Sequence, residues 1–294
     1  IDASETQYWD DEGGGYNNDN DATADGNNEG WLPIGLGTNK QFQGFYNGDY
    51  HRILNLHIKR EIKSDAENIG FISRIYLPVS SAGLVRLGII GGDLTILNSD
   101  STGNIGGIIG QYFPSSDTQF DQVFFEGRIE NQDQSGRIGG LVGWFFANSG
   151  NGAVTNSYAN VDIFGGGLVI GGLFGRQSSG FSENVYARGS FDPNGDSDFD
   201  FGGLVGNADP FNFDYKLEYG YSAFEINNAD GKEAYTIVGN DEDGRPDDTG
   251  YFTNLYYDTS LSSAGWNDGD VAGYKDTNVQ GQTTAFLTSS ATLA

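Results

Sequence analysis

A six-residue phrase, in which two adjacent glycines are followed by two apolar residues and a third glycine, recurs along this chain at nearly constant spacing. Its clear copies are residues 105–110, 138–143, 170–175 and 201–206. Their first glycines are 33, 32 and 31 residues apart, and degenerate copies begin at Ile69 and Ile237. A fixed period of this size is typical of stacked structural units that bury their apolar faces against one another. We therefore expect a repeat protein with a long surface rather than one closed catalytic pocket.

Each phrase is followed by a polar stretch and then by a short segment rich in β-branched and aromatic residues. These segments are residues 122–129, 156–163, 184–191 and 220–226. Their composition and the turn residues around them are typical of β-strands. No window of ten or more residues has a helical period with capping residues. The sequence therefore predicts an all-β chain.

Stacking explains how such a chain could acquire a core. A repeat of about 32 residues with short strands cannot bury its own apolar face. That face becomes buried when each strand pairs with its equivalent in the next repeat, about 4.8 Å away. This favours a parallel β-solenoid, similar to a β-helix, with an inner ladder of Ile108, Leu141, Leu173 and Leu204. The glycines would serve tight corners, positive φ angles or close backbone approach. An antiparallel sandwich or a propeller is the alternative.

Composition divides the chain into three regions. Residues 1–30 form an acidic, Gly- and Asn-rich N-terminal segment, residues 31–239 carry the repeats, and residues 240–294 contain an acidic turn and a closing module. The chain has 41 acidic and 15 basic residues and a net charge of −26, which disfavours nucleic acid and anionic lipid as partners. No apolar run is long enough to insert into a membrane.

Two residue types are missing from the chain. It has no Cys, which excludes disulfides, thiolate zinc sites and thiol nucleophiles. It also has no Met and begins at Ile1, so we expect a processed product or a segment of a longer protein.

The glycine phrase resembles the GLUG motif of large bacterial surface proteins. Further segments resemble that family's upstream, opening and closing modules, namely residues 1–4, 30–35, 42–48, 51–56, 254–258 and 281–287, whereas residues 71–104 depart from its pattern. The resemblance implies an extracellular, multidomain bacterial protein, either adhesin-like or an accessory region of a secreted protease whose chemistry lies in another domain. It thus implies a non-enzymatic, structural or adhesive segment of a cell-surface protein. The unpaired strand edges at the ends of a solenoid could also pair with another chain, so a variant of this expectation sets the segment in a fibre or repeat array. The expected partners are surface glycans, other copies of the chain or adjacent domains.

Acidic turns are the candidate metal sites. Hard cations such as Ca²⁺ prefer clustered carboxylate and amide oxygens. One turn offers Asp192, Asn194, Asp196, Asp198 and Asp200. A second resembles thrombospondin-type calcium repeats and offers Asp241, Asp243, Asp247 and Asp248. Residues 17–25 form a looser third cluster. We expect a structural Ca²⁺, and solvated acidic turns are the alternative reading.

Signals for catalysis are weak. His51 and His57, the two histidines, would share one face of a strand and could form a metal or acid–base pair, but ordinary strand positions explain them as well. The chain has no zinc-protease motif, nucleophile elbow or phosphate-binding loop. Exposed aromatic residues, for which Trp144, Phe145 and Phe146 are candidates, could bind a sugar or a partner. The alternative function is therefore a carbohydrate-binding or polysaccharide-processing module.

Overall fold

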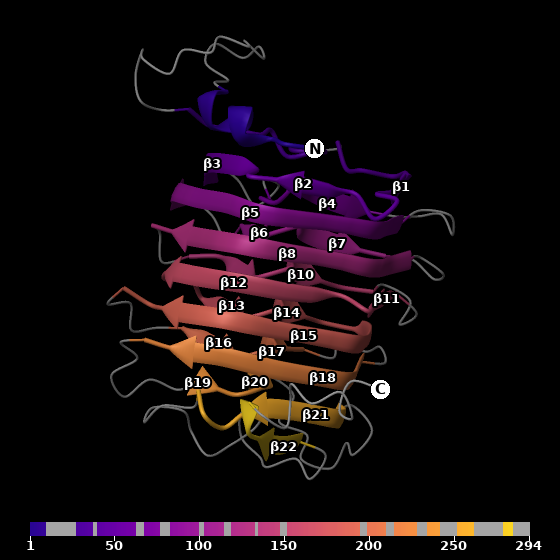
Figure 1. Cartoon of the computed structure of the whole chain (residues 1–294), viewed down its shortest axis with the longest axis vertical. Coiled ribbons are helices and arrows are strands. Elements are labelled where there is room, and N and C mark those ends of the chain that lie inside the picture. Colours follow the sequence, from indigo (N-terminus) through magenta and orange to yellow (C-terminus); the bar gives the residue numbers. More distant parts are fainter. Residues whose placement is uncertain are drawn as a thin grey trace.

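The protein is a parallel β-solenoid, seen here in a computed structural model (Figure 1). Its strands form three sheets that stack along one axis, with the first strands at one end and the last at the other. The paired strands are parallel throughout the described part of the chain, so the predicted parallel solenoid is confirmed and the antiparallel sandwich is wrong. The described residues are 1–9, 28–37, 40–62, 68–76, 83–99, 103–114, 119–132, 135–147, 152–194, 199–209, 215–227, 234–241, 252–261 and 279–284, except the side chains of 98, 99, 119 and 241.

Within these described residues the strands divide among a broad sheet and two narrower ones. The broad sheet contains β1 (Phe45–Asn47), β2 (Arg52–Leu54), β3 (His57–Ile62), β5 (Gly83–Ser99), β8 (Gln119–Asn131), β11 (Ala153–Thr155), β12 (Tyr158–Gly165), β15 (Gly180–Asp192), β18 (Tyr215–Ile226), β21 (Phe252–Asp258) and β22 (Val279–Gln282). The second sheet contains β4 (Ile72–Tyr76), β7 (Ile109–Phe113), β10 (Val142–Phe145), β14 (Phe174–Gln177), β17 (Val205–Ala208) and β20 (Val238–Asp241). The third contains β6 (Asn104–Gly106), β9 (Arg137–Gly139), β13 (Val169–Gly171), β16 (Asp200–Gly202) and β19 (Ala234–Tyr235).

The core consists of ladders of equivalent apolar side chains. In the third sheet the successive partners Ile105, Ile138, Ile170, Phe201 and Ala234 are 33, 32, 31 and 33 residues apart and fully buried. The predicted inner ladder is also confirmed, because Ile108, Leu141, Leu173 and Leu204 each have 0% exposure. Backbone hydrogen bonds of 2.9–3.0 Å join its consecutive members and extend it to Ile237. The degenerate copies of the phrase therefore belong to the same stack.

Three glycines in each phrase are required for three different close approaches. A Cβ on Gly171 would lie 1.8 Å from the carbonyl oxygen of Phe174 in its own coil. A Cβ on Gly172 would lie 2.2 Å from Gly203 O in the next coil, and one on Gly175 would lie 2.6 Å from Gly143 O in the preceding coil. None of these three glycines has a positive φ. Close backbone approach therefore explains the repeated glycines, and the positive-φ alternative is wrong for them.

A column of left-handed residues occupies the same register position in six successive coils of the broad sheet, from β5 to β21. These residues are Arg86, Gln122, Asn156, Asn184, Tyr219 and Asn254, with φ between 49° and 57°. Asn is among the residues that adopt this conformation most readily. Hydrogen bonds link the column along the axis, from Asn184 Nδ2 to Asn156 Oδ1 at 3.3 Å and from Asn156 Nδ2 to Asp121 Oδ1 at 2.7 Å.

The N-terminal residues cover the edge of the first coil. A 3₁₀ helix, η1 (Ser4–Tyr8), lies against β3, and Ala3 N donates to Leu54 O at 2.7 Å. Trp31 N donates to His57 O at 2.8 Å, and Ile34 N donates to Phe71 O at 3.1 Å. Irregular chain on a sheet edge prevents that edge from pairing with another molecule. The described residues of the acidic N-terminal segment are thus part of the solenoid's end.

Two further features were not evident in the sequence. The stretch 71–104, which departs from the repeat pattern, contains β5, the longest described strand, which pairs with β8 on both sides of a bulge between Ile90 and Gly92. The phrase at 254–258 lies in β21, which extends the broad sheet to β22. Among the described residues, no helix has the length and apolar character needed to cross a membrane.

Candidate functional surfaces

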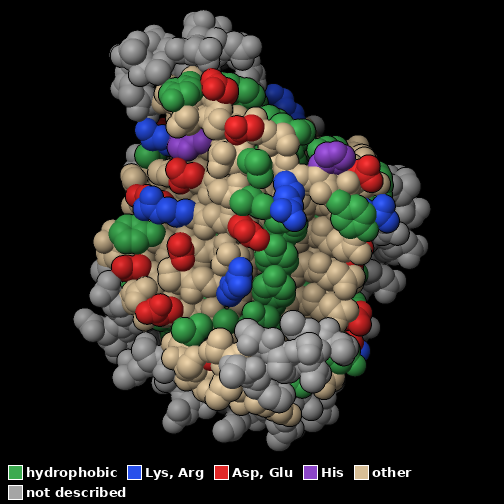
Figure 2. Space-filling view, in the orientation of Figure 1, with side chains coloured by type: hydrophobic (Ala, Val, Ile, Leu, Met, Phe, Trp, Pro, Cys, Tyr) green, Lys and Arg blue, Asp and Glu red, His purple; other side chains and the backbone are tan. Residues whose placement is uncertain are grey.

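An aromatic ladder runs along the outer face of the broad sheet. Phe124, Tyr158, Tyr186 and Tyr221 are successive partners in register, and Tyr256 is the next partner. Ring centroids are 4.8, 4.6 and 5.2 Å apart along the first four, and consecutive rings are within 15° of parallel. Figure 2 shows hydrophobic side chains in a band along the stack on this face. The parallel register therefore places one ring per coil at the same point.

The ladder offers ring edges rather than ring faces to solvent. Each interior ring is covered on both faces by its neighbours, and the outer face of Phe124 has the guanidinium carbon of Arg52 5.8 Å from its centroid. Tyr158 Oη donates to Glu126 Oε1 at 2.7 Å. Burial raises the pKa of Tyr186 to about 12 and also raises the pKa of Tyr158. These stacks join successive coils, and they leave no free face on Tyr158 or Tyr186 for a sugar ring.

A shallow depression of about 410 Å³ lies beside the ladder. Gly91, Gly92 and Gly127 contribute no side chains to it, and the register shifts between Ile90 and Gly92. Its other lining residues are Ile90, Glu126, Arg128, Asn160 and Asp162. A bulge and small residues thus open a polar hollow in an otherwise flat sheet.

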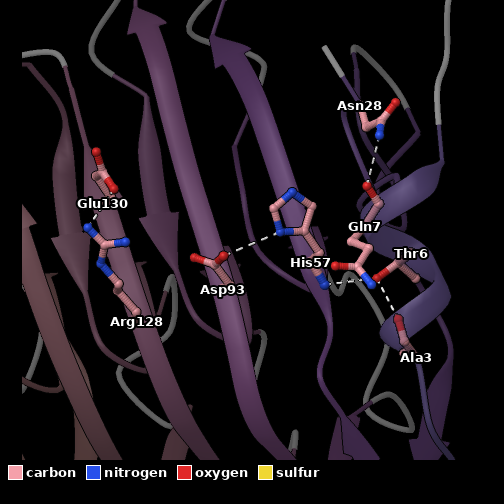
Figure 3. Close-up of polar contacts among 8 residues, drawn as sticks. All are labelled: Ala3, Thr6, Gln7, Asn28, His57, Asp93, Arg128 and Glu130. Carbon is pink, nitrogen blue, oxygen red and sulfur yellow. Dashed lines mark hydrogen bonds and ion pairs between the residues drawn. The ribbon is translucent and has the colours of Figure 1, made fainter. Parts of the chain in front are cut away.

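A row of polar side chains borders this depression on β3, β5 and β8. His57 Nδ1 lies 3.4 Å from Asp93 Oδ2, and Arg128 pairs with Glu130 at 2.6 Å (Figure 3). The hydrogen bond from His57 lowers the pKa of Asp93. The backbone of His57 is also held by η1, because His57 N donates a hydrogen bond to Thr6 Oγ1 at 2.9 Å. Within the described residues the His57 ring has Asp93 as its one polar side-chain partner.

The two histidines do not form a site together. His51 Nδ1 lies 3.0 Å from Gly48 O, whereas His57 faces Asp93. Asn55, with φ 58°, separates β2 from β3 and breaks the strand alternation that would have placed both on one face. Figure 2 shows them as two separate patches. The two rings have different partners, so the structure supports ordinary strand positions rather than the two-histidine alternative.

The aromatic candidates divide between the core and the surface. Phe145 has 0% exposure and packs between Tyr112 and Phe174, so its suggested binding role is wrong. Trp144 and Phe146 point outward from the second sheet and are half-buried. Strand alternation places residues on either side of Phe145 on the opposite face.

An arginine–aromatic cluster surrounds Trp144 on the outer face of the second sheet. The cluster comprises Arg74, Tyr76, Phe113, Arg137, Trp144, Phe146 and Arg176. The guanidinium carbons of Arg137 and Arg176 lie 5.0 and 5.9 Å from the Trp144 ring centroid. Arg176 is ion-paired with Asp209, and Arg137 Nη1 donates to Asn104 Oδ1 at 3.3 Å. The periodicity of the sequence gave no signal for this cluster, because its members come from four coils.

The proposed metal ligands lie only partly within the described residues. Asp192 Oδ1 accepts a hydrogen bond from Asn194 N at 2.9 Å, and Asp200 Oδ2 accepts one from Asn240 Nδ2 at 2.8 Å. The remaining ligands lie outside the described side chains: Asp196, Asp198, Asp241, Asp243, Asp247, Asp248 and the cluster at 17–25. Among described residues there is no group of three or more acidic, His or Cys side chains that could hold a metal. The calcium sites remain a prediction.

The fold and these surfaces define the class of protein, a repeat protein of the parallel β-solenoid type. No protein family matches the chain, and no curated protein matches it. It is similar to the crystal structure of a protein from Bacteroides ovatus provisionally described as an immunoglobulin A1 protease. The TM-score is 0.57 and the identity 18%, over 90% of this chain and 75% of that chain. At this identity the likeness shows the fold alone.

Proposed function

We propose that the chain is a non-enzymatic, extracellular segment of a bacterial cell-surface protein, and that it acts as a rigid adhesive and display module. The observation that carries this proposal is the continuous aromatic ladder on the outer face, from Phe124 to Tyr221. This surface ladder adds stacking energy between the successive coils that carry Phe124, Tyr158, Tyr186 and Tyr221, at about 0.5–1.5 kcal/mol per ring pair. Stiffness along the axis is useful to a module that holds other domains away from a cell.

The resemblance to GLUG-motif repeats supports the surface location. The Bacteroides ovatus neighbour carries a provisional protease description, and in the described residues of this chain His57 is paired with Asp93. The chain also has no Cys that could act as a nucleophile. We therefore propose that any chemistry of the parent protein lies in another domain.

Adsorption and turnover assays test this function together. The purified chain is expected to bind intact cells or glycan-coated surfaces and to release no reducing sugar and no peptide from polysaccharide and immunoglobulin substrates. Substrate-dependent release that is lost in the Asp93→Asn variant would contradict the non-enzymatic proposal. A chain that adsorbs to none of these surfaces would contradict the adhesive part.

Calcium at the acidic turns is the second part of the proposal. A cation that binds only the folded state stabilises it, by about 2.7 kcal/mol at a concentration 100-fold above the dissociation constant. The melting temperature is expected to rise by several degrees when Ca²⁺ replaces a chelator. The variant Asp192→Asn with Asp200→Asn removes part of one cluster and is expected to reduce that rise. Equal melting temperatures with Ca²⁺ and chelator would contradict the metal assignment.

The depression beside the ladder favours a carbohydrate-binding or polysaccharide-processing module as the second candidate function. Its rim combines Glu126, Arg128, Asn160 and Asp162, which offer both donors and acceptors to sugar hydroxyls. Binding of a neutral oligosaccharide that is lost in Asn160→Leu and kept in wild type would favour this candidate. Binding that is unchanged in Asn160→Leu would contradict it.

A further inference from the structure

The arginine–aromatic cluster contains a cation that no carboxylate among the described residues neutralises. Arg74 is half-buried on β4, and burial lowers the pKa of its guanidinium. Its Nε has no hydrogen-bond acceptor, and no carboxylate among the described residues lies within ion-pair distance of it. A partly buried charge without a partner is costly unless a counterion approaches from outside.

Neighbouring rings hold this guanidinium in position. The Arg74 Cζ atom lies 5.4 Å from the Phe113 ring centroid and 5.6 Å from the Tyr76 ring centroid. Phe113 in turn contacts Trp144 edge-to-face, with centroids 5.3 Å apart and planes at 73°. An arginine stacked on rings has already lost much of its side-chain freedom, so less entropy is lost when its N–H groups bind an anion.

The charge pattern of the chain makes this location unusual. The chain has a net charge of −26, yet Arg137 and Arg176 both lie over Trp144, and Arg74 lies over Phe113, which contacts the same tryptophan. Local positive charge on an acidic protein is felt by a ligand in contact with it, because charges farther away than the Debye length of about 8 Å are screened at physiological salt. The cluster therefore favours a negatively charged ligand that binds at short range.

The cluster is elongated along the solenoid axis. Arg74, Gln111, Trp144 and Arg176 are successive partners in the second sheet, which places Arg74 and Arg176 three strands apart. At about 4.8 Å per strand, this separation is about 14 Å. Arg176 is already paired with Asp209, so Arg74 is the cation of this row that remains for a ligand. The half-buried side chains of Arg74 and Trp144 lie along one line, which suits an extended chain that contacts the cluster at more than one point.

We propose that the arginine–aromatic cluster binds the carboxylate groups of an acidic, uronate-containing polysaccharide that lies along the second sheet. This inference rests on the adhesive function proposed above and assigns it a ligand class and a site. Arg74 donates two parallel N–H hydrogen bonds to a uronate carboxylate, the geometry that the guanidinium fork matches best. Tyr76, which is 38% exposed at the edge of the cluster, offers an apolar surface to the adjoining sugar ring.

Titration calorimetry of the full chain with an oligogalacturonate at 0.15 M salt tests the site. Arg74→Gln is expected to weaken binding about 10- to 100-fold, because a charge-assisted hydrogen-bond pair is lost. Arg74→Lys keeps the charge without the fork and is expected to restore binding only in part. Arg86→Gln is the matched control, since Arg86 also stacks on a tyrosine, with its Cζ 5.3 Å from the Tyr50 centroid, but lies on the broad sheet. Its affinity is expected to stay within about twofold of wild type.

Three results would overturn the inference: equal binding by Arg74→Gln and wild type, equal binding of neutral dextran, or equally tight Arg74-dependent binding of polyglutamate. The last result would make the cluster a general carboxylate site rather than a saccharide site. Adsorption of the same variants to intact cells separates this inference from the proposed function. Wild type and Arg74→Gln that adsorb equally would refute the site and leave adhesion standing. Oligogalacturonate binding without cell adsorption would support the site and refute adhesion.

Discussion

Replacing Gly171 by Ala tests the close approach that explains the repeated glycine phrase. The new Cβ would lie 1.8 Å from Phe174 O and 2.6 Å from Gly206 N, whereas real Cβ atoms essentially never come within 3.0 Å of such atoms. The carbonyl must therefore move by at least 1.2 Å, the difference between 3.0 and 1.8 Å. Overpacking costs about 1–3 kcal/mol, and the backbone position of both clashing atoms places this case at about 3 kcal/mol.

The assay for Gly171→Ala is thermal unfolding followed by circular dichroism. For a chain of this size each kcal/mol lowers the melting temperature by about 2–4 °C, so a loss of about 6–12 °C is expected. Gly44→Ala is the matched control, because its Cβ would meet first the end of the Phe42 ring, at 3.2 Å, and its φ is not positive. The control is expected to cost less than about 1 kcal/mol. A Gly171→Ala protein that melts within about 2 °C of the Gly44→Ala protein would refute the steric reasoning.

Three further predictions concern the broad face. Tyr186→Leu removes two ring stacks and is expected to lower the free energy of unfolding in urea by about 1–3 kcal/mol. The control Tyr8→Leu changes an exposed residue and is expected to lower it by less than about 0.5 kcal/mol. Equal losses in the two variants would contradict a stabilising ladder. Because burial raises the folded-state pKa of Tyr186 to about 12, its contribution is complete below the unfolded value of about 10 and is lost as pH rises from there toward 12. Tyrosinate absorbance should then rise together with loss of circular dichroism, and full ionisation near pH 10 in the folded state would argue against it. Asp93 has a lowered folded-state pKa, so its contribution is present above about pH 3.9 and lost below it. Asp93→Asn should therefore cost at most about 1 kcal/mol at pH 7 and nothing at pH 2, and a cost that is unchanged at pH 2 would contradict the contact with His57.

The aromatic ladder also bears on how glycan binding by solenoids should be judged. Sugar rings stack on exposed aromatic faces, and in this ladder the faces of Tyr158 and Tyr186 are covered by their neighbours. The number of surface aromatic residues on a sheet is therefore a poor guide to binding. In the arginine–aromatic cluster, by contrast, Phe113 and Trp144 meet edge-to-face. Arginine side chains lie over the faces of these two rings.

The glycine period and the strand-like segments together favoured a parallel solenoid over a sandwich or propeller, and they predicted the ladder from Ile108 to Leu204. This was possible because each coil stacks on the next in the same way. Every close backbone approach therefore recurs at the repeat length and requires a glycine at the equivalent position. The same regularity explains why the strand segments at 122–129 and 184–191 were correctly predicted.

Side-chain partnerships across coils were decided only by the tertiary structure. Phe145 was a surface candidate by composition, but strand alternation directs it into the core and leaves Trp144 outside. Arg74 and Trp144 are 70 residues apart and join one cluster because the register of β4, β7 and β10 places them on one outer face. The sequence period fixes which residues are equivalent, since it reports the backbone approaches that every coil repeats. Which non-equivalent side chains meet depends on how the strands of each coil are placed around the axis and on which side chains point outward. The repeat period of a single sequence does not report this placement.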